Sequence, residues 1–319
     1  MKAVSIKEPG GPEVLEWAEV EDPSPAAGEV VVDVVASALN RADVMQRMGL
    51  YPLAPGTSPY PGLEVSGRLS ALGEGVTEWQ VGDEVCALLT GGGYAQKVAV
   101  PVGQLLPVPE GTGLVEAAGL PEVTATVWSN LVMTAGLKEG ETLLVHGGLG
   151  GVGSIAIQVA KALGARVVTT VGGPEKVARA RELGADVAVD HRSEDFTEQG
   201  PYDVVLDVIG GDYLERNLGS LAADGRLVVI GLQNGLDGRL NLADLVFKRL
   251  SVYGTTLRTR SKEQKAAIVA EVRRHVWPMI ENGSVRLLVE DRLPMEEAAE
   301  AHRRMEAGGH TGKILLVND

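Results

Sequence analysis

The chain has 319 residues, 45% of them hydrophobic, and this length predicts about two domains with ordinary buried cores. Its formal net charge of −14 argues against a nucleic-acid groove or an anionic membrane surface as the main partner. The chain shows no apolar signal segment at its start and no apolar run long enough to span a membrane, and its one cysteine, Cys86, can form no internal disulfide. We therefore expect a cytoplasmic protein.

The first third of the chain is rich in β-strand signals. Apolar segments alternate with glycine and proline turns such as Pro9-Gly10-Gly11-Pro12 and Gly91-Gly92-Gly93. Strands are predicted at Met1–Ile6, Val30–Ala36, Ser66–Leu72, Glu84–Leu89 and Ala95–Pro101. This pattern predicts a small, irregular, barrel-like domain over residues 1–118.

Residues 119–260 change to alternating helix and strand. Helices are predicted at Val123–Met133, Gly153–Leu163, Glu175–Leu183 and Tyr213–Ser220. Strands are predicted at Glu141–His146, Arg166–Val171, Val187–Asp190, Asp203–Asp207, Gly225–Ile230 and Ser251–Leu257. Such alternation is typical of an α/β domain with a doubly wound parallel sheet.

Residues 261–319 form a short C-terminal segment. It is predicted to hold helix Ser261–Glu281 with a break before Pro278, helix Met295–Ala307 and strand Gly312–Val317. Because this segment is too small to stand alone, we expect it to fold back onto the first domain and complete it.

The most informative motif lies between the first strand and the second helix of the α/β region. Gly148, Gly150 and Gly153 fit G-x-G-x-x-G in the context of a strand, a tight turn and a helix. The glycines let the backbone approach a pyrophosphate, and the helix N-terminus offers N–H groups and a positive dipole end. The motif predicts a dinucleotide-binding site.

The residues after the next strand indicate which dinucleotide binds. A chain that prefers NAD usually ends this strand with an acidic residue, whereas Val171 is followed here by Gly172 and Gly173. The missing carboxylate leaves room for a 2′-phosphate, to which Lys176 could offer a charge-assisted hydrogen bond. His191 and Arg192 could close the same pocket, although each basic residue alone is as compatible with a solvated surface. Together these residues favour NADPH over NADH.

Several motifs resemble the zeta-crystallin-like quinone oxidoreductases of the medium-chain dehydrogenase/reductase superfamily. They are Ser37–Asp43, Pro61–Gly67, Val81–Asp83, Gly91–Ala95, the glycine loop and Thr311–Ile314. The resemblance covers essentially the whole chain and extends to the tumour-suppressor-inducible branch at Asn40–Tyr51, His146–Leu149 and Phe247–Arg249. It implies a Rossmann doubly wound sheet joined to a GroES-like β-barrel catalytic domain.

The resemblance also implies where NADPH lies, in a cleft between the domains. Residues of the nicotinamide end would be Asn40, Tyr51, Thr126, Gly231, Leu232 and Leu257. Gly150, Gly151, Val152 and Gly153 would hold the pyrophosphate, and Gly172, Gly173, Lys176 and His191 would surround the 2′-phosphate. The chain departs from its relatives at two positions. The nearest branch has serine at the position of Gly150, and relatives often have tyrosine at the position of His191.

A zinc site is not expected. Zinc-dependent relatives need a cysteine near position 40 and a histidine beside the glutamate of a Gly-His-Glu motif, whereas this chain has Asn40 and Leu63. A single cysteine also cannot build a four-cysteine structural lobe, and zinc needs three or four such ligands. Without a Lewis acid, an already activated acceptor is the favoured substrate.

The leading hypothesis is NADPH-dependent reduction of a quinone or a similar conjugated carbonyl. Tyr51, with help from Asn40, is the candidate for hydrogen bonding to the acceptor oxygen as charge develops there. Reduction of the double bond of 2-alkenals or enones is the alternative reaction, and no residue pattern separates the two. A NADPH-binding protein with a structural, sensing or RNA-associated role is the alternative outside enzymes, and the acidic charge weakens its RNA version.

The last strand of the sheet predicts a homodimer. Ser251–Leu257 carries Val252, Tyr253 and Leu257, and an exposed apolar edge strand invites pairing. Relatives are similar in joining two sheets at this edge across a twofold axis. The alternative is that helix Ser261–Glu281 covers the edge.

Overall fold

The computed structural model describes residues 1–51, 53 and 57–318. The contacts between residues divide the chain into two compact units. Unit 1 comprises Met1–Ala125, Leu257–Glu281 and Leu287–Asp319, and unit 2 comprises Thr126–Thr256 and Asn282–Arg286. The predicted domain limits after residues 118 and 260 stay predictions.

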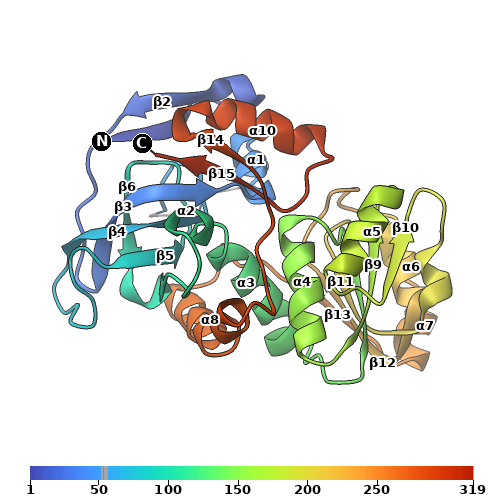
Figure 1. Ribbon diagram of the computed structural model, residues 1–319. Coiled ribbons are helices and arrows are strands. Elements are labelled where there is room, and N and C mark those ends of the chain that lie inside the picture. The colour runs from blue at the N-terminus through green and yellow to red at the C-terminus, as the bar shows by residue number, and fades with distance from the viewer. Residues whose placement is uncertain (52, 54–56, 319) are drawn as a thin grey trace. The chain divides into compact units, whose positions relative to one another are not determined.

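Unit 1 is built on a seven-stranded sheet in the order β14-β15-β3-β4-β5-β7, with β6 also paired to β3 (Figure 1). Its strands are β3 (Glu29–Ala38), β4 (Glu64–Leu72), β5 (Glu84–Leu88), β6 (Lys97–Pro101), β7 (Leu105–Pro107), β14 (Val289–Pro294) and β15 (Lys313–Val317). A separate two-stranded sheet pairs β1 (Lys2–Ile6) with β2 (Leu15–Glu19). Val30, Val32 and Val34 of β3 enter the core because alternate residues of a strand face the same side.

The C-terminal strand completes this sheet. β15 runs antiparallel to β3 and pairs Leu315 with Ala38, so residues far apart in the sequence become neighbours. Ile314 and Leu316 are buried in the same core as the β3 valines. The last strand of the chain thus lies beside β3 in the sheet of unit 1.

The helices of unit 1 are short apart from α8 and α10 of the C-terminal segment. They are α1 (Arg41–Arg47), α2 (Leu114–Ala117), α8 (Lys262–His275), α9 (Trp277–Glu281) and α10 (Ala298–Ala307). Ser261 caps α8 by accepting a hydrogen bond from Gln264 N, and Pro278 stands in the first turn of α9, so the predicted break before it is confirmed. α8 contacts the turn at Gly103, where a Cβ would lie 2.8 Å from Ala266 Cβ.

Unit 2 contains a six-stranded parallel sheet in the order β10-β9-β8-β11-β12-β13. The strands are β8 (Thr142–His146), β9 (Arg166–Val171), β10 (Val187–Asp190), β11 (Tyr202–Asp207), β12 (Leu221–Val229) and β13 (Ser251–Gly254). The helices are α4 (Gly151–Ala162), α5 (Pro174–Glu182), α6 (Tyr213–Ser220) and α7 (Leu242–Phe247). The strand order reverses between β8 and β11, the point at which doubly wound sheets bind ligands.

Two predicted elements of unit 2 end differently. The strand predicted at Ser251–Leu257 stops at Gly254, because Gly254 pairs with Val229 and β12 ends there. The helix predicted at Val123–Met133 is α3 (Pro121–Trp128), which crosses the unit boundary, followed by a π-helical segment at Ser129–Thr134. There the Ser129 and Asn130 side chains both donate to Thr126 O.

Residues 282–286 also differ from expectation, since they pack with unit 2. The Gln158 amide of α4 donates to Arg286 O at 2.9 Å and accepts from Arg286 N at 2.8 Å. Among the described residues, no helix combines the length and the apolar character that crossing a membrane requires.

Candidate functional site

The glycine loop connects β8 to α4 in unit 2. Gly147 has a φ of +70°, and Gly147 N and Gly148 N both donate to Thr170 O at 3.1 Å. Gly150 then precedes the first turn of α4, whose leading N–H groups have no partner within a helix. The loop therefore presents backbone N–H groups where the carboxyl end of β8 meets a helix N-terminus, as an anion site requires.

Two of the three motif glycines are required by packing. A Cβ at Gly148 would lie 2.0 Å from Thr169 Oγ1, and one at Gly153 would lie 2.2 Å from Gly147 O. At Gly150 the nearest atom would be 3.4 Å away, an ordinary contact. Gly153 therefore keeps α4 close to the loop, whereas position 150 has room for a Cβ.

A buried polar network lies beneath the loop. His146 Nδ1 is 3.0 Å from Thr170 Oγ1, and its Nε2 is 2.8 Å from Asn217 Oδ1. Asn217 Nδ2 donates to Asp207, whose other oxygen accepts from Ile209 N and Gly210 N. Burial lowers the pKa of His146 and keeps the ring neutral. The network joins the ends of β8, β9 and β11 at the switch point of the sheet.

A second group of predicted residues gathers after β9. An ideal Cβ at Gly172 would lie 3.1 Å from His191 Nε2 and 3.2 Å from Arg192 Nε, so both side chains lie against this turn. Gly173, with a φ of +98°, donates its N–H to Asp190 Oδ1 at 2.9 Å. Lys176 is half-buried in the first turn of α5. Gly172, Gly173 and His191 are thus brought together, and Arg192 joins them.

The remaining predicted residues of unit 2 lie at the ends of its elements. Thr126 is buried at the start of the unit, and its carbonyl accepts from Asn130 Nδ2 at 2.8 Å. Gly231 follows β12, and a Cβ there would meet Val208 O at 2.6 Å. Leu232 beside it is 47% exposed, an apolar side chain available for contact.

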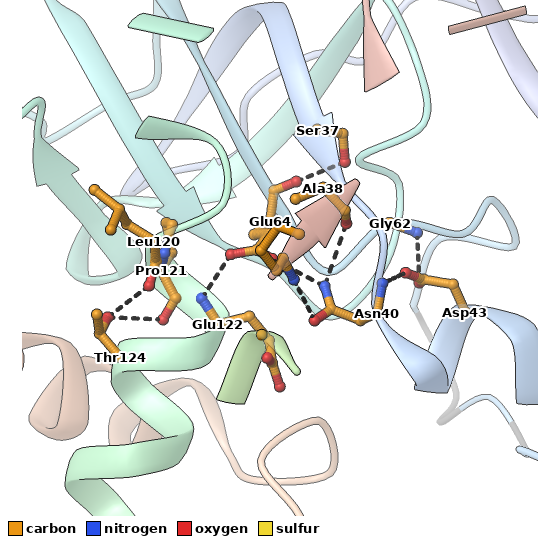
Figure 2. Close-up of polar contacts among 12 residues, drawn as sticks. Ser37, Ala38, Asn40, Asp43, Gly62, Glu64, Leu120, Pro121, Glu122 and Thr124 are labelled. Carbon is orange, nitrogen blue, oxygen red and sulfur yellow. Dashed lines mark hydrogen bonds and ion pairs between the residues drawn. The ribbon is translucent and has the colours of Figure 1, made fainter. Parts of the chain in front are cut away.

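In unit 1, Asn40 belongs to a buried polar cluster with Glu64 and Lys313. Asn40 Nδ2 donates to Glu64 Oε1 at 3.0 Å and to Ala38 O at 3.2 Å, while Asn40 Oδ1 accepts from Lys313 Nζ at 2.8 Å. Lys313 Nζ also lies 2.6 Å from Glu64 Oε1, and Glu64 Oε2 accepts from Glu122 N (Figure 2). Both oxygens of Glu64 are therefore held within unit 1.

A neighbouring carboxylate fixes the backbone around Asn40. Asp43 accepts hydrogen bonds from Asn40 N, Gly62 N and the Tyr94 hydroxyl (Figure 2 shows the bond from Gly62). Its complete burial raises the pKa of its carboxyl, against the lowering effect of these N–H donors. The Tyr94 hydroxyl is bonded to Asp43, and α1 starts in a fixed position.

Tyr51 lies against a residue that the sequence did not single out. The Arg258 guanidinium is 5.0 Å from the centroid of the Tyr51 ring. Arg258 is 5% exposed; its Nε donates to Thr90 O at 2.9 Å and its Nη2 to Gln46 Oε1 at 2.5 Å. Leu257, half-buried beside it, belongs to unit 1 and not to the sheet of unit 2.

Two basic side chains of unit 1 received no role from the sequence. Lys313 entered only within the family motif Thr311–Ile314, and Arg258 was not singled out. The two in unit 1 contact residues more than two hundred positions away, namely Asn40 and Gln46. An isolated Lys or Arg within an apolar strand or turn is the sequence feature that could have indicated these contacts. A charge buried in this way needs a partner elsewhere in the chain.

The residues of unit 1 do not fit a zinc ion. Asn40 and Leu63 replace the cysteine and histidine ligands, and the oxygens of Glu64 are bonded to Lys313, Asn40 and Glu122. An ammonium group thus lies beside Glu64, whereas zinc prefers thiolate and imidazole donors. In the part of the chain that the structure describes, no cluster of three His, Cys, Asp or Glu side chains is arranged to bind a metal.

Family models match both units. Residues 26–110 match the alcohol dehydrogenase GroES-like domain, and residues 151–271 match the domain described as zinc-binding dehydrogenase. A polyketide synthase of Mycobacterium tuberculosis is 34% identical over 98% of this chain, which spans only 15% of that protein's length.

Similar proteins of the same length are also known. A quinone oxidoreductase of Pseudomonas aeruginosa is 34% identical over 99% of this chain and 99% of its own. The structure of Escherichia coli quinone oxidoreductase complexed with NADPH has a TM-score of 0.89 and 31% identity, and covers 99% of this chain and 100% of that chain. CurK enoyl reductase has a TM-score of 0.88 and 28% identity, and covers 100% and 99%.

The matches confirm the predicted combination of a Rossmann sheet with a GroES-like domain, whereas the narrower resemblance to the tumour-suppressor-inducible branch stays a prediction. The chain belongs to the zeta-crystallin-like quinone oxidoreductases of the medium-chain dehydrogenase/reductase superfamily.

Proposed function

We propose that this oxidoreductase uses NADPH to reduce a quinone or a related conjugated carbonyl without a metal. The observation that carries the proposal is the cofactor site: Gly148 and Gly153 leave no room for a side chain, and the two positions directly after β9 are glycines and not an acidic residue. The basic side chains of His191 and Arg192, which lie against Gly172, suit a 2′-phosphate. The E. coli relative, whose structure was solved with NADPH, supports the same cofactor here.

Each predicted cofactor residue has a proposed part. Gly150, Gly151, Val152 and Gly153 hold the pyrophosphate through backbone N–H groups. Residues of the 2′-phosphate pocket are Gly172, Gly173, Lys176 and His191, to which we add Arg192. Residues of the nicotinamide end are Asn40, Tyr51, Thr126, Gly231, Leu232 and Leu257.

The chemistry of unit 1 favours an acceptor that is already activated. The dihydronicotinamide, when bound, supplies the reducing equivalents. Tyr51 is proposed to donate a hydrogen bond from its hydroxyl to the acceptor oxygen, where negative charge develops. Arg258 supports this role because its guanidinium holds the Tyr51 ring from within the unit and stabilises a phenol whose oxygen gains negative character.

Reduction of an activated carbon–carbon double bond is the second candidate reaction. The similarity to CurK enoyl reductase over the whole chain favours it. An enone and a quinone both carry a carbonyl oxygen that becomes negative when hydride adds to the conjugated system. Tyr51 could donate a hydrogen bond to this oxygen in either substrate.

A substrate panel tests the proposal. The purified protein is mixed with NADPH and a series of quinones and enones, and the loss of NADPH absorbance is followed. We expect turnover with at least one quinone and a higher kcat/KM for quinones than for enones. The reverse order would assign the chain to double-bond reduction, and tight NADPH binding with no turnover by any acceptor would indicate a structural or sensing protein.

We further propose that the chain forms a homodimer through β13. This strand is last in the sheet order, and Val252 and Tyr253 on it are 41% and 37% exposed. Phe247 of the neighbouring α7 is 81% exposed, which enlarges the apolar surface. The cytoplasmic location also stays a prediction.

A further inference from the structure

The chain contains two Asn-Gly dipeptides, Asn234-Gly235 and Asn282-Gly283, and all four residues are exposed to solvent. In such a dipeptide the amide nitrogen of the glycine can attack the side-chain carbonyl carbon of the asparagine. Glycine makes this attack easier than other residues do, because it has no Cβ to crowd the nitrogen and its backbone turns freely. The structure gives the two dipeptides different surroundings.

Asn282 begins a turn that follows α9 and belongs to unit 2. Its Oδ1 accepts a hydrogen bond from Ser284 N at 2.9 Å. This bond closes a ring of atoms that includes Cγ of Asn282 and the nitrogen of Gly283, so the side chain is folded back toward that nitrogen. Among the described residues Gly283 N–H has no hydrogen-bond partner, and a Cβ at Gly283 would meet no atom within 4 Å.

The bond from Ser284 also favours the attack electrostatically. When Gly283 N adds to Cγ of Asn282, the intermediate is tetrahedral and Oδ1 carries the negative charge. An N–H group already directed at this oxygen stabilises the charge, as the donors of an oxyanion hole do. Ser284 N–H has the position of such a donor before the reaction begins.

Asn234 lacks these features. No described residue donates a hydrogen bond to its side-chain oxygen, and Gly235 N–H is already bonded to Leu232 O at 3.4 Å. Its backbone is also held, because Asn234 N donates to Ile209 O at 2.8 Å and a Cβ at Gly211 would lie 2.3 Å from Asn234 O. The side chain and the next nitrogen must therefore rearrange before they can react.

We propose that Asn282 is a site of spontaneous modification, at which asparagine is converted to aspartate and isoaspartate. The bond from Gly283 N to Cγ of Asn282 forms a five-membered succinimide, while the bond from Cγ to Nδ2 breaks and ammonia leaves with the proton of the Gly283 amide. Water then opens the ring. Addition of water at Cγ gives aspartate, and addition at the main-chain carbonyl gives isoaspartate, so water is the only other reactant.

Isoaspartate affects the fold here because the chain just after the turn is fixed. Val285 is fully buried, and Arg286 N and O are both bonded to the Gln158 amide of α4. Isoaspartate adds a carbon to the main chain and shortens the side chain, so the bond from Ser284 N cannot keep its geometry. We expect the bonds between Arg286 and Gln158 to open more often in this form, whereas aspartate keeps an oxygen for Ser284 N.

The first test compares the two dipeptides in one sample of the wild-type protein, so no variant has to fold. The protein is incubated at mildly alkaline pH, its peptides are mapped by mass spectrometry over time, and an isoaspartyl methyltransferase labels the isoaspartate. We expect Asn282 to react about tenfold faster than Asn234, as for one hydrogen bond to an oxygen that gains charge. Equal rates, or faster reaction at Asn234, would overturn the proposal.

Two substitutions at position 284 isolate the N–H donor. Ser284→Pro and Ser284→Ala both remove the hydroxyl, but only proline removes the N–H. We expect Asn282 to react about tenfold more slowly in Ser284→Pro than in Ser284→Ala, with the rate at Asn234 the same in both variants. Equal rates at Asn282 in the two variants would refute the role of Ser284 N.

Hydrogen exchange tests the effect on the fold. The Arg286 amide should exchange faster in aged protein that contains isoaspartate than in fresh wild-type protein, while fresh Asn282→Asp should exchange at the wild-type rate. Equal exchange in all three samples would show that the modification leaves the contact with α4 intact and would overturn this part of the proposal.

Discussion

Tyr51 is the side chain on which the proposed chemistry depends most. Tyr51→Phe keeps the ring and its contact with Arg258 but removes the hydroxyl, so we expect kcat/KM for quinones to fall by on the order of 10²-fold. Steady-state assays with several quinones measure this. Tyr253→Phe on β13 is the matched control and should keep full activity; equal turnover of wild type and Tyr51→Phe would remove Tyr51 from the reaction.

His302 gives a pH dependence of stability. It is fully buried, its Nδ1 is 3.2 Å from Arg47 Nη1, and Tyr94 packs edge-on against it. Burial, aided by the positive charge of Arg47 and opposed by Glu306, lowers the pKa of His302 to about 3. The unfolded chain therefore binds one more proton than the folded chain between about pH 6.5 and pH 3.

The sign follows from this difference. The contribution of His302 is fully present above about pH 6.5, and stability falls by about 1.4 kcal/mol per pH unit as the pH drops through the window. Urea unfolding at several pH values should give a smaller slope for His302→Gln, which keeps an acceptor for Arg47 but does not titrate. The exposed His275→Gln should keep the wild-type slope. Equal slopes for His302→Gln and wild type would contradict the assignment.

Local and distant residues differ in how well the sequence predicts them. The glycine loop, Gly172 and Gly173 follow strands directly, so their positions depend only on neighbours in the chain. Lys313 and Arg258 depend on contacts with Asn40 and Gln46, which only the folded unit brings within reach. The sequence therefore suggested cofactor residues in these turns, which stay a prediction, but it did not indicate the side chains that contact Asn40 and Tyr51.

At the scale of elements, the strand–loop–helix unit at β8 and α4 gives a matched pair of substitutions. Gly153→Ala places a Cβ 2.2 Å from a backbone oxygen, which must move, and we expect a loss of about 1–3 kcal/mol in stability together with weaker NADPH binding. The Cβ of Gly150→Ala meets nothing nearer than 3.4 Å, so this variant should keep both stability and NADPH binding. Thermal unfolding measures the stability of the two variants, and calorimetry measures their affinity for NADPH. A Gly153→Ala variant with wild-type stability and affinity would contradict the packing argument.

The predicted limits were most accurate for strands and helices whose ends do not depend on a neighbouring element. Arg166–Val171, Val187–Asp190 and Tyr213–Ser220 have the predicted limits. Ser251–Leu257 was too long because its end depends on where β12 stops, and the π-helical segment at Ser129–Thr134 depends on side chains that bond to Thr126 O. Helices α1 and α7 were not predicted; each has only six or seven residues, too few for a clear period.

At the scale of the whole molecule, the exposed apolar residues of α7 and β13 predict association. Light scattering should give the mass of a dimer at micromolar concentration. Phe247→Glu, on a side chain that is 81% exposed, should shift the protein toward the monomer without lowering its melting temperature by more than a few degrees. Val81→Glu, at a 63% exposed turn of unit 1, is the control. A monomeric wild type would refute pairing at this edge.

The account depends above all on a site for a phosphate on the adenosine ribose, and the most direct measurement is the affinity for NADPH and NADH by calorimetry. Wild-type protein should bind NADPH more tightly, and Lys176→Ala should lose roughly 1.5–3 kcal/mol of NADPH binding, as for a hydrogen bond to a charged group, while NADH binding barely changes. Equal affinity of the wild type for both nucleotides, or equal weakening of both by Lys176→Ala, would contradict the account.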